Sequence, residues 1–129
     1  MKILVFGNPL VEEDSLALKI AKVLAKKFPE IDFKELDAVE EIQNEGKNPV
    51  ILDVVQGIKK PVLLSNFAQL KTEKIYSMHD FDLGMTLKLL KKLGFIETVK
   101  IIAVPISYDK KKALEETKII ISSLFSESV

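Results

Sequence analysis

The residues of this chain best suited to metal or acid–base chemistry lie near the boundaries of predicted elements. They are Asp14, Asp37, Asp53 and the single histidine, His79, which together supply three carboxylates and one imidazole. Oxygen and nitrogen donors of this kind suit a borderline divalent cation, provided that the fold brings them to one place. The sequence therefore raises a candidate site whose geometry depends on the elements around it.

Asp53 is the hardest of these residues to explain as a surface charge. It interrupts the apolar run PVILDVV at residues 49–55, and burying an unpaired carboxylate is costly. Asp14 has an alternative role, because together with Glu13 it could cap the following helix, where acids favour the positive end of the dipole. His79 could be an exposed residue ahead of a helix, so on chemistry alone both interpretations stay open.

The spacing of apolar residues predicts the elements that hold these positions. Short apolar runs, continuous or alternating, are typical of strands, and apolar residues at helical spacing are typical of helices. The predicted strands are residues 2–6, 31–36, 49–55, 62–67 and 99–106, with 62–67 near the edge of the sheet. The predicted helices are residues 14–28, 81–93 and 111–125, with a short acidic helix or turn at 38–48.

The helix at residues 81–93 follows His79 and is rich in leucine. Gly94 is expected to cap its C-terminal end, because glycine adopts the left-handed conformation found there. The side chains expected to face the core are Leu83, Leu87, Leu90 and Leu93.

Strands that alternate with helices predict one α/β domain over residues 1–129. We expect a three-layer sandwich, with a mostly parallel, twisted, five-stranded sheet and helices on both faces. Ligands bind such sheets beyond the carboxyl ends of the strands, where the strand order reverses. Asp14, Asp37, Asp53 and His79 all fall at that edge in this prediction. The start of a helix would favour the neutral form of His79, which is the form that binds metal.

Composition excludes several classes of function. The formal net charge is +0, so no overall field attracts nucleic acid or an anionic membrane. All 19 basic residues are lysines, which disfavours phosphoryl chemistry, and the absence of cysteine excludes thiolate catalysis. No apolar run approaches the roughly 20 residues that cross a bilayer, and the N-terminus lacks the pattern of a signal peptide. We therefore expect a cytoplasmic protein without membrane insertion.

Several motifs together resemble one known family. Residues 5–26, VFGNPLVEEDSLALKIAKVLAK, look like the opening of the nickel-iron hydrogenase maturation endopeptidases, where a strand runs into a G-N-x-L-x-x-D-[DE] loop and a helix. Similar features follow in the same order along almost the whole chain: Asp37 after the second strand, Ile51 to Asp53 ending the third, Ser77 to His79 before the leucine-rich helix, and V-P-I-S at Val104 to Ser107.

This resemblance implies a fold, an activity and a partner. Family members have a largely parallel five-stranded sheet between helices, and they remove the C-terminal extension of a [NiFe] hydrogenase large-subunit precursor after nickel insertion. Their nickel ligands, two acids and a histidine, fall on Asp14, Asp53 and His79, which would be both metal-binding and catalytic. The nickel would arrive with the substrate, and cadmium or zinc could replace it in vitro.

The remaining positions of the motifs imply substrate positioning by Asp37, Gly7 and Asn8. The chain departs from the family where residues 15–17 replace a G-x-G and where Ala38 follows Asp37 in place of a glycine-rich segment. These departures leave a second hypothesis, a non-catalytic relative that recognises nickel loading. A third is an unrelated flavodoxin-like or receiver-like module, although the sequence has no clear phosphate-cradling loop.

Overall fold

The computed structural model of the chain describes residues 1–6, 15–55, 57–65 and 78–126. For Val39 and residues 78–82 it describes the backbone but not the side chains. Within these ranges, no helix has the length and apolar character needed to span a membrane.

The core of the fold is a five-stranded sheet in the order β2-β1-β3-β5-β4. The strands are β1 (Lys2–Val5), β2 (Asp32–Glu35), β3 (Val50–Val55), β4 (Val62–Leu64) and β5 (Lys100–Pro105). All neighbouring pairs are parallel except β4 and β5, which are antiparallel. The mostly parallel sheet and the edge position of β4 confirm the prediction.

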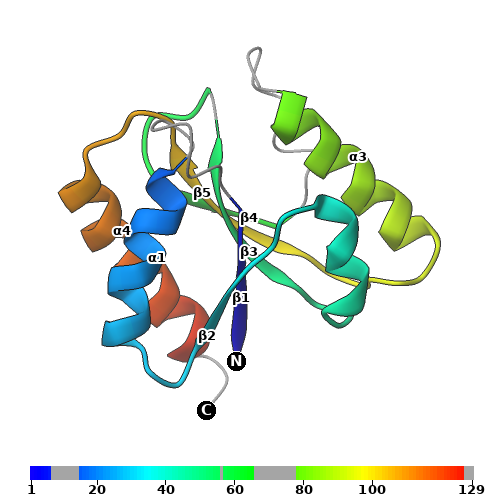
Figure 1. Cartoon of the computed structure of the whole chain (residues 1–129), viewed down its shortest axis with the longest axis horizontal. Coiled ribbons are helices and arrows are strands. Elements are labelled where there is room, and N and C mark those ends of the chain that lie inside the picture. The colour runs from blue at the N-terminus through cyan, green and yellow to red at the C-terminus, as the bar shows by residue number, and fades with distance from the viewer. Residues whose placement is uncertain (7–14, 56, 66–77, 127–129) are drawn as a thin grey trace.

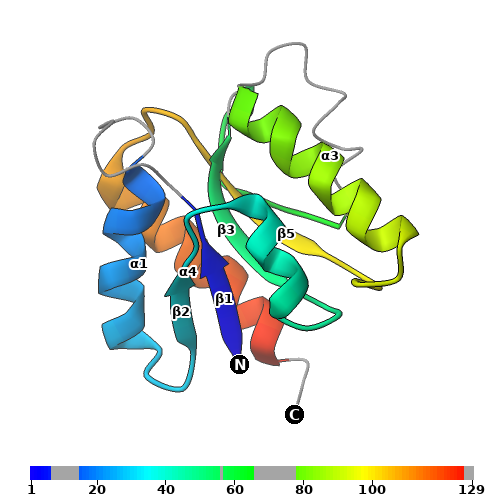
Figure 2. The same cartoon turned by 45° about the vertical axis from the view of Figure 1, so that its right-hand side comes forward.

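Helices cover both faces of this sheet, as Figures 1 and 2 show. The helices α1 (Leu16–Lys27) and α4 (Lys110–Ser126) contact each other on one face. The opposite face carries α3 (Met78–Lys92), which contacts the short 3-10 helix η1 (Val39–Asn44). The predicted three-layer α/β sandwich is therefore confirmed.

Alternation along the buried strands divides their side chains between two cores. In β3, Leu52 and Val54 pack with the side chains of α1 and α4. Ile51 and Val55 belong to the other cluster, which includes the inward-facing leucines of α3. Because side chains of a strand point alternately to opposite faces, Asp53 lies on the face that α3 covers.

The beginning and the end of α3 differ from the prediction. The helix begins at Met78 instead of residue 81, so His79 lies in its first turn and not ahead of it. At the other end, Leu93 was expected to face inward, but its side chain is 60% exposed. The helix ends in a Schellman motif, in which Phe95 N–H donates to the Leu90 carbonyl and Gly94 has a φ of 83°. The capping role of Gly94 is confirmed.

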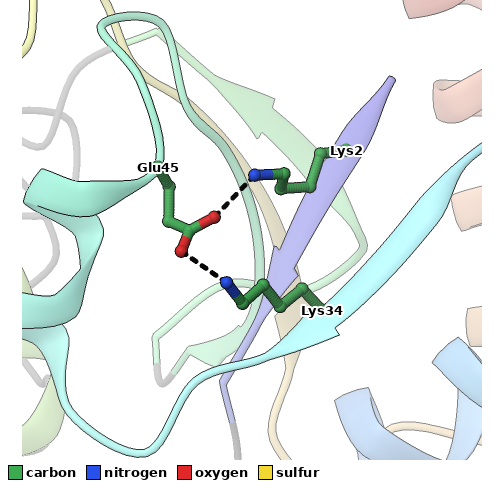
Figure 3. Close-up of polar contacts among 3 residues, drawn as sticks. All are labelled: Lys2, Lys34 and Glu45. Atoms are coloured by element: carbon green, nitrogen blue, oxygen red, sulfur yellow. Dashed lines mark hydrogen bonds and ion pairs between the residues drawn. The ribbon is translucent and has the colours of Figure 1, made fainter.

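A charged cluster ties η1 to the sheet. Glu45, just after η1, accepts hydrogen bonds at 2.7 Å from the Nζ atoms of Lys2 on β1 and Lys34 on β2 (Figure 3). The Glu45 side chain is only 5% exposed, and the bonds from Lys2 and Lys34 lower the pKa of its carboxyl group. The same contact raises the pKa of Lys34. The cluster therefore links β1, β2 and the end of η1 through one carboxylate.

Candidate functional site

The topology reverses between β1 and β3. From β1 the chain moves to β2 on one side and then returns to place β3 on the other side. Such a point is where open α/β sheets bind ligands, in the crevice beyond the carboxyl ends of the two strands. A site in this fold is therefore expected where β1 and β3 end.

Asp53 is the described acid at this point. It is the fourth residue of β3 and is 1% exposed, among strand residues that are all apolar. Its Oδ1 atom accepts a hydrogen bond of 2.8 Å from the backbone N–H of Val54. The prediction that an acid interrupts a buried strand is confirmed. A carboxylate in such a place must be held by polar partners or by a cation, because an uncompensated charge would be costly.

Within the described strands, the residues beside Asp53 on its own face of the sheet are small or apolar. Ala103 on β5 is its register partner, and Ala103 is fully buried. On the other side, Phe6 continues the β1 ladder, since its N–H donates to the Leu52 carbonyl at 3.1 Å. Phe6 is 2% exposed and belongs to the core cluster of the α3 face. These two residues were not singled out from the sequence, and the strand register is what identifies them.

The first turn of α3 reaches the same edge of the sheet. In both views, the N-terminal end of α3 lies on the side where β1 and β3 end (Figures 1 and 2). The backbone of His79 is part of this turn, but its side chain is not among those that the structure describes. The side chain of Asp53 projects toward the face that α3 covers, so it lies on the same face of the sheet, and near the same edge, as the backbone of His79.

The other candidates are placed less completely. Asp14, Gly7 and Asn8 lie outside the described residues. The described chain resumes at Ser15, which is buried and precedes α1. Asp37 follows β2, the outermost strand on that side, and its side chain is exposed. The fold thus separates Asp37 from Asp53 by the width of β1.

A second polar pair lies beyond β5, on the opposite face. The Tyr108 hydroxyl donates to the two carboxylate oxygens of Glu116 on α4, at 3.0 and 3.1 Å. Partial burial and the Glu116 carboxylate raise the pKa of Tyr108, so its hydroxyl stays protonated at neutral pH. Tyr108 packs with the α1 and α4 core, which places it across the sheet from Asp53. We treat this pair as a structural contact between the loop and α4.

The described side chains alone do not complete a metal site. Among them, no group of three acidic, histidine or cysteine residues is arranged to hold a metal ion. Of the three predicted ligands, Asp14, Asp53 and His79, only Asp53 has a described side chain. The absence of a metal-binding group among the described side chains therefore does not test the predicted site. The donor types fit a divalent cation, because two carboxylates and a neutral imidazole supply oxygen and nitrogen ligands.

The architecture defines a class of α/β sandwich that differs from flavodoxin-like modules. Flavodoxin-like sheets follow the order 2-1-3-4-5, whereas here β5 lies between β3 and an antiparallel edge strand, β4. Solved structures with this fold include endopeptidases that mature hydrogenases.

Three such structures illustrate the likeness. An endopeptidase from Escherichia coli has a TM-score of 0.69 and 18% sequence identity, covering 99% of this chain and 94% of its own. The hydrogenase maturating endopeptidase HybD from E. coli has a TM-score of 0.66 and 20% identity, with the same coverage of 99% and 94%. The Hydrogenase 3 maturation protease has a TM-score of 0.59 and 15% identity, covering 92% of this chain and 87% of its own.

No family model and no curated protein matches the sequence. At the identities above, the similarity to solved structures establishes the fold. The resemblance noted from the motifs is therefore confirmed at the level of the fold.

Proposed function

We propose that this protein is an endopeptidase that removes the C-terminal extension of a nickel-loaded [NiFe] hydrogenase large-subunit precursor. The observation that carries this proposal is the position of Asp53. It is a buried carboxylate at the topological switch point, on the sheet face covered by a helix whose first turn contains His79. The fold shared with HybD and the Hydrogenase 3 maturation protease supports the same function.

In this proposal, nickel is part of the substrate. Asp14, Asp53 and His79 bind the ion that the precursor carries, and this contact fixes the scissile bond beside them. The bound ion supplies Lewis-acid chemistry, either to the scissile carbonyl or to an attacking water. Two carboxylates and one imidazole without thiolates form an open site, so it can release its cargo after cleavage. Cadmium and zinc have compatible ligand preferences and are expected to substitute in vitro.

The enzyme's own residues perform binding and orientation. Asp53 is held in one position by the Val54 N–H and by its place within β3. Phe6 and Ala103 flank it with apolar surface, which strengthens its attraction for a cation by excluding water. Asp37, Gly7 and Asn8 are proposed to position the precursor chain. The working compartment is proposed to be the cytoplasm.

A second candidate function is a nickel checkpoint without cleavage. It is favoured by the sequence after Asp37, where Ala38 and the 3-10 helix η1 stand in place of a glycine-rich segment. In that case the protein would bind the nickel-loaded precursor and leave it intact.

The experiment that separates these functions follows the mass of the precursor. The protein is incubated with a nickel-loaded large-subunit precursor, and the nickel-free precursor serves as the control. Loss of the extension from the loaded precursor alone supports the endopeptidase. Stable binding without shortening supports the checkpoint, and failure to bind the loaded precursor contradicts both functions.

A further inference from the structure

The outer side of α3 carries a row of exposed apolar side chains. Met85, Leu89 and Leu93 are 47%, 54% and 60% exposed, and Phe95 in the following turn is 47% exposed. These four residues form what we call the α3 stripe. Residues four apart lie one above the other on a helix, so Met85, Leu89 and Leu93 form a continuous line.

The α3 stripe is unusual on the described surface. The two other large apolar side chains of comparable exposure are Met1 and Ile119, and both stand apart from the stripe in sequence. Single exposed apolar residues are normal, whereas a contiguous row marks an interaction site. Leu83, Leu87 and Leu90 already fill the opposite side of α3 with core contacts, so the stripe is not part of the core.

Positive charge borders the stripe on one flank. Lys88, Lys91 and Lys92 are all exposed. At 100° per residue they occupy the side of α3 between the buried leucines and the stripe. Among the described residues, none of the three forms an ion pair. Within the part of the chain that the structure describes, this flank is therefore available to attract negative charge on a partner.

The geometry points to the α3 stripe and its lysine flank as a docking surface for the precursor, which we propose presents an acidic and apolar surface there. This inference rests on the proposed function, because it names the precursor as the occupant. His79 and Met85 are six residues apart in α3, about 9 Å along the axis. The Met85 end of the stripe therefore lies close to the candidate site along α3, and a protein bound along the stripe would have its extension within reach of that site.

Two other occupants fit the surface less well. In a symmetric antiparallel pair of α3 helices from two copies, each flank faces its own counterpart. Lys88, Lys91 and Lys92 would then oppose the same lysines, and like charges in an interface are unfavourable. An anionic membrane would favour lysines on both sides of an inserted row, whereas these lysines lie on one flank only.

The test compares binding and cleavage of the nickel-loaded precursor by surface variants. Leu89→Ser removes the centre of the stripe and Lys91→Glu reverses its flank. Ile119→Ser and Lys111→Glu, both on exposed positions of α4, are the matched controls. Leu89→Ser and Lys91→Glu are expected to raise Kd and KM by about tenfold or more and to leave kcat at saturation unchanged. The controls are expected to behave as the wild type.

Two further measurements are the salt dependence of precursor binding and the oligomeric state and vesicle binding of the protein. The wild-type Kd is expected to rise with salt, and Lys91→Glu is expected to remove most of that dependence. Wild-type affinity in Leu89→Ser and Lys91→Glu would overturn the docking surface and leave the proposed function intact. If the wild type is a dimer and Leu89→Ser is a monomer, the stripe binds a second copy of this chain. If the wild type binds anionic vesicles and both variants lose that binding, the stripe binds a membrane. Either result would overturn the proposal.

The outcomes also separate this proposal from the proposed function. If the wild type binds the precursor without cutting it and Leu89→Ser weakens binding, the docking surface stands and the endopeptidase fails. If the wild type neither binds nor cuts the loaded precursor, both proposals fail together.

Discussion

Asp53 is an acidic residue that is almost completely buried, in the central strand β3. Asp53→Asn keeps the size of the side chain and removes the charge that favours a divalent cation. We expect processing of the nickel-loaded precursor to fall by at least about a hundredfold, more than the 10–100-fold loss common for residues that only support a ligand. Initial rates of extension release, followed by mass, measure this effect.

The control for this substitution is Asp32→Asn. Asp32 is exposed at the amino end of β2, away from the switch point. It should process the precursor at the wild-type rate, and both variants should unfold cooperatively. Equal rates for Asp53→Asn and Asp32→Asn would show that Asp53 has no part in the reaction.

Thr117 is, like Asp53, a buried polar residue, but it lies in α4 and not at the candidate site. Its side chain is fully buried in α4, and within the described residues its Oγ1 has no hydrogen-bond partner. Thr117→Val replaces that hydroxyl with a methyl group of similar size, so we expect the free energy of unfolding to rise by about 1 kcal/mol. Urea denaturation measures it. Thr98→Val is the contrast, because the Thr98 hydroxyl donates to Asn48 and its removal should bring no gain.

The C-terminal end of α3 depends on one backbone conformation. Gly94 has a φ of 83°, and a Cβ atom there would meet nothing within 4 Å. The cost of Gly94→Ala is therefore conformational and should be about 1 kcal/mol, the penalty of the left-handed region for a residue with a side chain. Chemical denaturation should show it, with Lys22→Ala on the exposed side of α1 as a near-neutral control. An unchanged midpoint for Gly94→Ala would mean that the Schellman turn contributes no stability.

The core face of α3 was predicted correctly from the sequence, but its first residue and the position of Leu93 were not. Leu83, Leu87 and Leu90 were correctly expected in the core, because their spacing follows one face of a helix. The next position on that face is 94, which is a glycine, so Leu93 lies away from the core and adds to the α3 stripe. The start at Met78 was missed because residues 78–80 carry no periodic signal, and that error placed His79 ahead of the helix.

Across the entire fold, the strands and the edge position of β4 were predictable from the sequence, but the order of the other strands was not. Apolar runs such as residues 49–55 identify buried strands locally, and the acid within that run identified Asp53 as a candidate. The placement of β5 between β3 and β4 depends on pairing between distant segments, which periodicity does not encode. The salt-bridged Glu45 was also missed, since its partners Lys2 and Lys34 are 43 and 11 residues away.

The Glu45 cluster makes stability depend on pH. The pKa of Glu45 is lowered from its ordinary value of 4.5 in the folded state. Its contribution is therefore fully present above the unfolded value and is lost as the pH falls through the lowered pKa. We expect Glu45→Gln to lower the melting temperature by a few degrees near neutral pH. The gap to the wild type should close as the pH falls below about 4.5.

The matched control for this effect is Glu97→Gln. Glu97 pairs with Lys47 at 3.9 Å, and both side chains are more than half exposed, so this pair should contribute little. Thermal unfolding across the acidic range compares the two variants. A gap for Glu45→Gln that persists unchanged at low pH would contradict the assigned role of its ionised carboxylate.

The geometry of the proposed site can be tested by anomalous diffraction from crystals soaked with cadmium. Cadmium is expected to take the place of the substrate's nickel, because carboxylate and imidazole ligands accept both ions. We predict one strong peak beyond the carboxyl ends of β1 and β3, within coordination distance of Asp53, His79 and Asp14. The same soak of Asp53→Asn should lose that peak. Cadmium bound elsewhere with none at Asp53, or a His79 side chain directed away from the ion, would contradict the proposed site.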